Sequence, residues 1–133
     1  MQPNNRSIGN KFESIANKFL ENKGYKIIDT NFYSSRYGEI DIITEYENKI
    51  IFVEVKGRKN LKYGTGDTSI TRTKKIKLIK SCQLWFLKNS FDKKIAEKDW
   101  QIDVIVITEE INQEKIKYKV KHYKNCITFN DLK

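Results

Sequence analysis

Two short apolar runs with charged side chains near their ends carry the chemistry that this sequence can perform. The first run starts at Gly38 and contains Asp41, and the second ends with Glu54 and Lys56. A polar turn at residues 45–49 separates the runs, which is typical of a β-hairpin. Antiparallel pairing puts the start of one strand beside the end of the other, and side chains alternate in direction. We therefore expect Glu39, Asp41, Glu54 and Lys56 to share one patch, in which Glu39 is the spare acid.

Such a patch suits Mg²⁺ or Mn²⁺, because hard cations prefer oxygen ligands and retain several waters. Asp41, Glu54 and the main-chain carbonyl of Val55 are the candidate metal ligands, and a substrate phosphate would add another oxygen. The metal would polarise that phosphate and acidify a water. Lys56 would hold the water or stabilise charge on the phosphorus oxygens. Glu13, from an expected helix, would ligate the metal through a water. A pairing of surface charges across a hairpin is the alternative interpretation.

The net charge of +9 is concentrated directly after this hairpin. Residues 56–80 include nine lysines and arginines and a single acid, Asp67, which gives the segment a net charge of +8. A basic block of this kind favours a polyanionic partner, most often nucleic acid, although a solubilising surface is the alternative. The candidate nucleic-acid-binding residues are Arg36, Arg58, Lys59, Lys62, Arg72, Lys74 and Lys75.

The other elements are expected to hold the hairpin within a single domain spanning all 133 residues. Apolar residues at helical spacing predict a helix over residues 8–22, after a flexible tail at residues 1–6. Glu13 lies at the edge of its apolar stripe, where an acid can reach over the rim of a sheet. The further predicted elements are strands over 25–32, 101–107 and 115–123 and a helix over 72–89.

Composition excludes several classes of protein. The polar N-terminus shows no secretory signal, and the longest apolar runs, 50–53 and 104–107, are too short to span a bilayer. Cys82 and Cys126 lack metal or redox spacing, so we expect buried free thiols in the reducing cytoplasm. His122 is the only histidine, which excludes a His-based zinc site.

The order of these parts resembles the YraN-like family of small bacterial proteins, from about Gly9 to Phe129. The positions that carry the resemblance are Glu13, Asn31, 38–41, 52–58, Lys74 and 102–104. That family is similar to the PD-(D/E)XK nuclease superfamily, near Holliday-junction resolvases. The resemblance implies an α/β fold with a restriction-endonuclease-like core, in which helices flank a mixed central β-sheet. It also implies Asp41, Glu54 and Lys56 as the catalytic triad, with Glu13 as an accessory acid. Gln101 departs from the family pattern, which puts a secondary contact in doubt.

We therefore expect a Mg²⁺- or Mn²⁺-dependent endonuclease that hydrolyses DNA phosphodiester bonds, with branched or junction DNA as the implied substrate. Junction-cleaving relatives act as dimers, so the resemblance also implies a homodimer, and no membrane partner is expected. Two alternatives stay open. One is a nucleic-acid-binding module that kept the fold without useful turnover. The other is a protein-interaction subunit that uses the wide apolar face of the helix at 72–89, whose partner binding would not depend on salt.

Overall fold

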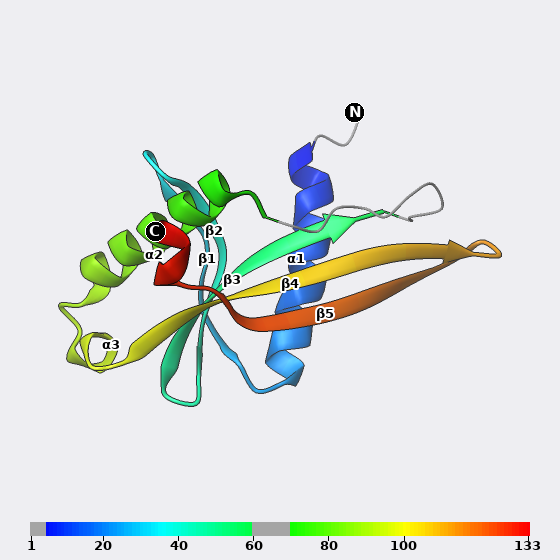
Figure 1. Ribbon diagram of the computed structural model, residues 1–133. Coiled ribbons are helices and arrows are strands. Elements are labelled where there is room, and N and C mark those ends of the chain that lie inside the picture. The colour runs from blue at the N-terminus through cyan, green and yellow to red at the C-terminus, as the bar shows by residue number, and fades with distance from the viewer. Residues whose placement is uncertain (1–4, 60–69) are drawn as a thin grey trace.

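A five-stranded sheet between two long helices forms the protein. The computed structural model describes residues 5–59 and 70–133, with residues 5–10 described as backbone only. The elements are α1 (Asn5–Asn22), β1 (Lys26–Ser34), β2 (Gly38–Tyr46), β3 (Lys49–Arg58), α2 (Arg72–Asn89), α3 (Lys93–Ala96), β4 (Asp99–Asn112), β5 (Lys115–Ile127) and the 3₁₀ helix η1 (Phe129–Leu132) (Figure 1). The strands follow the order β1-β2-β3-β4-β5, and β3 pairs with β4 in parallel while the other neighbours are antiparallel. This mixed α/β arrangement confirms the predicted fold class and is compatible with a restriction-endonuclease-like core.

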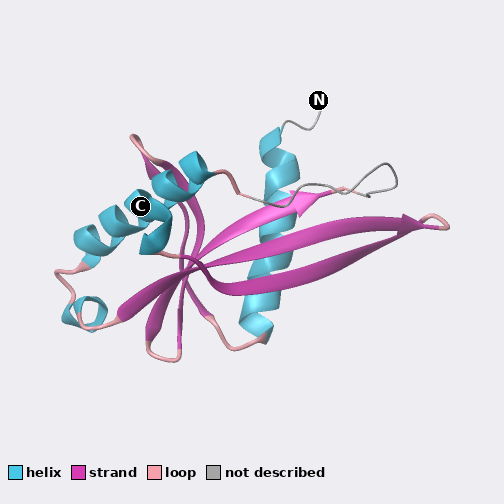
Figure 2. Ribbon diagram, in the orientation of Figure 1, coloured by secondary structure: helices cyan, strands magenta, loops and turns pink. Residues whose placement is uncertain are grey.

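Each long helix covers one face of the sheet (Figure 2). On one face, Phe12, Ala16 and Leu20 of α1 pack on apolar residues of β2, β3 and β4. On the other, α2 packs with Leu78, Ile79, Cys82 and Trp85, which are all buried. Because β3 and β4 lie under both helices, they need apolar side chains on both faces, which explains their nearly continuous apolar runs.

The sheet splits between β2 and β3. Their ladder runs from Tyr46, opposite Lys49, to Ile42, opposite Val53, and the register ends there. Beyond that point β2 stays paired with β1, whereas β3 continues alongside β4 as far as Arg58. Figure 1 shows the two strands diverging. We call the opening between residues 38–41 of β2 and residues 54–58 of β3 the fork. Main-chain groups at the fork lack their ladder partners, so side chains must satisfy them.

The β4–β5 hairpin is longer than the sequence predicted. Residues 107–112 of β4 and 115–121 of β5 form an arm that extends past the helices (Figure 1). Its turn places Gln113 and Glu114 at φ 50° and 66°. At the base of the hairpin the buried Asp103 carboxylate accepts from the main-chain N–H of Asn125 at 2.8 Å and contacts His122 Nε2 at 2.7 Å. Because these contacts satisfy the buried carboxylate, they give Asp103 a structural role.

Several predicted boundaries and environments need correction. The first helix begins at Asn5 and therefore includes the last two residues of the tail predicted at residues 1–6. The other tail residues, 1–4, lie outside the described part of the chain. The second helix is confirmed at Arg72–Asn89, where Thr71 caps it by accepting from the N–H of Lys74. The thiol prediction is confirmed for Cys82, which is buried, and is wrong for Cys126, which is exposed. Within the described residues, none of the helices combines the length and apolarity needed to cross a membrane.

Candidate active site at the fork

Asp41 and Glu54 meet where the sheet splits. The main-chain N–H of Val55 donates to Asp41 Oδ2 at 2.7 Å, so a carboxylate takes the place of the missing strand partner. Glu54 follows on β3 and is only 5% exposed. Burial, and then repulsion from Glu54, raises the pKa of Asp41 to about 8, against an ordinary value of 3.8. The fork therefore holds two mutually repelling carboxyl groups in a partly water-excluded position.

Lys74 supplies a positive charge to this pair from the first turn of α2. Its Nζ lies 2.8 Å from Glu54 Oε1. Burial lowers the pKa of Lys74, but the hydrogen bond and attraction from Glu54 outweigh it, so the pKa is raised overall. The sequence had placed Lys74 among the residues that contact nucleic acid. The structure adds a contact that the sequence did not predict: Lys74 neutralises a buried carboxylate, which explains why a lysine is tolerated in the first turn of a helix.

Glu13 approaches the fork from α1, which covers the face of the sheet opposite to α2. The helix packs closely against β3 at Gly57, because a Cβ added there would lie 2.2 Å from the ring of Phe12. Burial raises the pKa of Glu13, and charges on Glu39 and Glu54 add to that effect. Asn31 restrains this acid: the amide orientation that satisfies both of its ends puts its nitrogen 3.0 Å from Glu13 and 2.8 Å from Glu39.

Lys56 lies two residues beyond Glu54 on β3 and is half-buried. Strand alternation directs it to the same side of the sheet as Glu54. In the described part of the chain, no three His, Cys, Asp or Glu side chains are grouped so that they could hold a metal ion. The predicted ligand set contains only two such side chains, Asp41 and Glu54, and takes its third oxygen from the main-chain carbonyl of Val55. The donor chemistry fits a hard cation, because all three groups would bind through oxygen.

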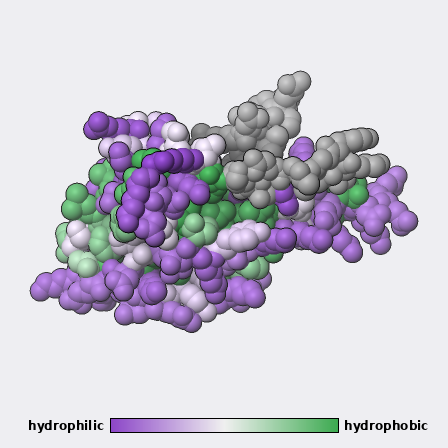
Figure 3. Space-filling model, viewed as in Figure 1, coloured by the Kyte–Doolittle hydropathy of each residue, from purple (hydrophilic) through white to green (hydrophobic). Residues whose placement is uncertain are grey.

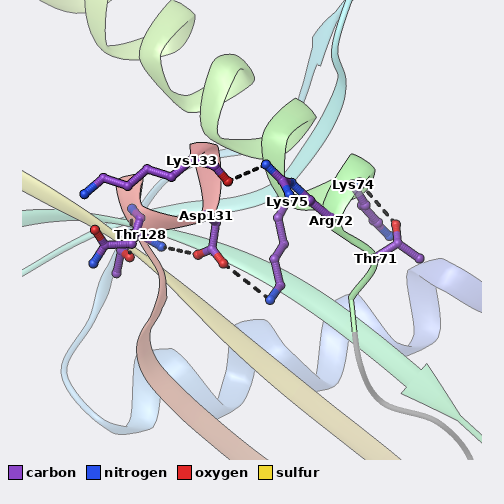
Figure 4. Close-up of polar contacts among 8 residues, drawn as sticks. Thr71, Arg72, Lys74, Lys75, Thr128, Asp131 and Lys133 are labelled. Carbon is purple, nitrogen blue, oxygen red and sulfur yellow. Dashed lines mark hydrogen bonds and ion pairs between the residues drawn. The ribbon is translucent and has the colours of Figure 1, made fainter.

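The predicted nucleic-acid-binding residues that the structure describes come from several different elements. Arg36 is exposed in the turn between β1 and β2, Lys59 is exposed after β3, and Lys62 lies outside the described residues. Two of the α2 residues contact the C-terminal segment (Figure 4). Arg72 donates to the carbonyl of Lys133, and Lys75 Nζ lies 3.5 Å from Asp131. Arg58 Nε donates to Thr108 Oγ1 at 2.8 Å.

Asn31 is the site residue to which sequence reasoning assigned no role. It lies inside β1 at φ 54°, a left-handed conformation that asparagine tolerates better than most residues. Asparagine is also depleted in strands. An asparagine just before the end of the strand predicted at 25–32 was therefore the signal that could have identified this position as special.

Comparisons with known proteins give the family. The model described as "Uncharacterised protein family UPF0102" matches residues 12–107. A UPF0102 protein of Vibrio parahaemolyticus is 39% identical over 102 residues, covering 77% of this chain and 81% of the relative. A UPF0102 protein of Alkaliphilus oremlandii is 37% identical over 122 residues, covering 92% of this chain and 98% of the relative. The matched region contains Glu13, Asp41, Glu54 and Lys56. The chain therefore belongs to the UPF0102 family, the YraN-like family that the order of its motifs indicated.

Proposed function

We propose that this protein is a Mg²⁺- or Mn²⁺-dependent nuclease of the PD-(D/E)XK type that hydrolyses phosphodiester bonds in DNA, with branched DNA as the favoured substrate. One observation carries the proposal. Asp41 and Glu54 come from diverging strands to adjacent positions at the fork, where burial and then repulsion from Glu54 raise the pKa of Asp41 to about 8. Buried carboxyl groups that repel each other are destabilising unless a cation or proton offsets them, which is a property of functional sites.

Each residue at the fork would have a separate role in hydrolysis. Asp41, Glu54 and the Val55 carbonyl would hold the metal, which when bound supplies Lewis-acid polarisation of the phosphate. Lys56 would donate hydrogen bonds to the phosphate oxygens on which charge develops, or orient the attacking water. Glu13, restrained by Asn31, would accept a proton through an intervening water. Lys74 would leave Glu54 when the metal binds and would then be available to a DNA phosphate.

Cleavage assays test the proposal directly. Duplex, single-stranded and four-way DNA would be incubated with Mg²⁺ or Mn²⁺ and wild-type protein, Glu54→Gln or Lys56→Met. Each variant is expected to lose at least about 100-fold in rate, because each removes a group that acts on the transition state. Asp92→Asn, which alters a helix cap far from the fork, is the control and should retain activity. The enzyme proposal fails if the wild type cleaves none of the substrates, or if both variants cleave as well as the control.

The Lys74–Glu54 ion pair favours one second candidate, a DNA-binding module that does not turn over. In such a protein the lysine would permanently occupy the position that a nuclease gives to its metal. Calorimetry with Mn²⁺ separates the two. A nuclease should release or absorb heat that disappears in Asp41→Asn, whereas the binding module should give no heat that depends on Asp41.

A further inference from the structure

The two faces of the β4–β5 arm have different surroundings. On one face the arm is braced by α1: Lys11 Nζ lies 2.9 Å from Glu109 and 5.1 Å from the ring centre of Tyr118. Side chains alternate along a strand, so the odd-numbered residues of β5 in this region point to the opposite face, on the side of α2. The exposed residues that do so include Lys117, Lys119 and Lys121.

The strand register connects this face to the candidate active site. Lys121 is opposite Val106 on β4, and Val106 is opposite Lys56 on β3. Neighbouring strands lie about 4.8 Å apart, so the backbone of Lys121 is roughly 10 Å from that of the candidate catalytic lysine. Val106 belongs to the core on the α2 side, which identifies the face that this row occupies.

The next row along the arm repeats the pattern. Lys119 is opposite Thr108, and Thr108 is opposite Arg58, whose Nε donates to Thr108 Oγ1 at 2.8 Å. Glu110 is an acid on this face, and its carboxylate lies 3.4 Å from Lys119 Nζ. Both of these side chains are substantially exposed, so the ion pair is weak and a phosphate can replace the carboxylate.

We propose that Lys117, Lys119 and Lys121, together with Arg58, form a track that binds the sugar–phosphate backbone of a DNA duplex arm leading away from the fork. The inference rests on the proposed function, because it takes its starting point at Lys56. Figure 3, which views this side of the molecule, shows hydrophilic surface along the arm. The charge is complementary to a polyanion, and a β-strand that carries a cation at every second residue presents a linear array to a linear ligand.

The length of the track sets the length of DNA that it reaches. From Lys121 to Lys117, β5 rises about 13 Å, at about 3.3 Å per residue. This distance corresponds to roughly four base pairs at 3.4 Å each. A duplex of about 20 base pairs is therefore long enough to occupy the whole track.

Fluorescence anisotropy without divalent metal measures this contact independently of cleavage. The arm variant is Lys117→Gln/Lys119→Gln/Lys121→Gln. The matched control is Lys18→Gln/Lys26→Gln/Lys49→Gln, which removes the same charge from exposed residues of α1, β1 and β3. Binding to a duplex of about 20 base pairs would be titrated at several salt concentrations. The arm variant should reduce the slope of log K against log[salt] by about 2 to 3, from the loss of three phosphate contacts. The control should change it by less than about 1.

The outcomes separate this inference from the nuclease proposal. Arm and control variants with equal slopes would overturn the track even if cleavage is observed. A reduced slope in the arm variant, with restored binding by Lys117→Arg/Lys119→Arg/Lys121→Arg, supports it even if the wild type cleaves nothing. Co-sedimentation with phosphatidylglycerol vesicles is the last measurement. If the arm variant loses vesicle binding and keeps its DNA binding, the lysines belong to a membrane-binding surface and the inference is overturned.

Discussion

Asp41 couples the ionisation of the fork to the stability of the metal-free protein. Its pKa is about 8 in the folded state against an ordinary value of 3.8, so the folded state carries one more proton than the unfolded state between those values. The free energy of unfolding should therefore fall as pH rises from about 4 to 8, by up to about 1.4 kcal/mol per pH unit. Urea unfolding in the presence of a chelator measures the slope. Asp41→Asn should flatten it, and equal slopes in variant and wild type would contradict the prediction.

Lys74 should compete with metal for Glu54. Replacing it by methionine removes an ammonium 2.8 Å from a carboxylate oxygen, so a divalent cation no longer has to displace it. We expect Lys74→Met to bind Mn²⁺ about fivefold more tightly, equivalent to about 1 kcal/mol for a partly exposed pair. Calorimetry measures the affinity. Lys75→Met, which loses only its contact with Asp131, should bind Mn²⁺ as the wild type does. Weaker metal binding by Lys74→Met would show that the lysine supports the site.

At the scale of elements, Gly57 allows α1 to lie close to β3. A methyl group at this position would lie 2.2 Å from the Phe12 ring and would push the first turns of α1, with Glu13, away from the fork. Gly57→Ala should cost about 2 kcal/mol of unfolding free energy, as overpacking typically does. A double-mutant cycle with Phe12→Ala measures the coupling by urea unfolding. Because Phe12→Ala removes the clash, the glycine substitution should then cost much less, and additive costs would refute the contact as the cause.

The elements differ in how well sequence predicted them, for physical reasons. Thr71 caps the second helix and its apolar residues recur at helical spacing, so local information specified both ends. In β5, apolar residues alternate with lysines from Ile116 to Val120, so the sequence predicted that strand. The outer part of β4, residues 108–112, has Ile111 as its one apolar residue, and the turn that follows contains no glycine. Backbone pairing with β5 holds residues 108–112, and periodicity does not report that pairing. The sequence also did not predict the fork. It forms because β2 stays paired with β1 while β3 stays paired with β4, and these long-range pairings leave no local pattern.

In the candidate site, too, sequence predicted the local features and not the contacts set by tertiary packing. Alternation and antiparallel pairing correctly predicted that Asp41 and Glu54 come together. Lys74 was predicted as a DNA contact, and its pairing with Glu54 could not be foreseen, since the packing of α2 against the sheet sets it. Asn31 is the reverse case: its type and position were visible, but the acids that it restrains come from two other elements, α1 and β2.

For the whole molecule, a net charge of +9 should make DNA a salt-sensitive stabiliser. A ligand that binds only the folded state at 100 times its dissociation constant adds about 2.7 kcal/mol, which for a domain of this size raises Tm by roughly 5–10 °C. Thermal unfolding with a duplex of about 20 base pairs should show this shift at about 50 mM salt and little of it at about 300 mM, because counterion release weakens binding steeply. Unfolding without DNA is the control at each salt concentration. A shift that persists at high salt would instead indicate an interface dominated by apolar contacts and would count against a basic DNA-binding surface.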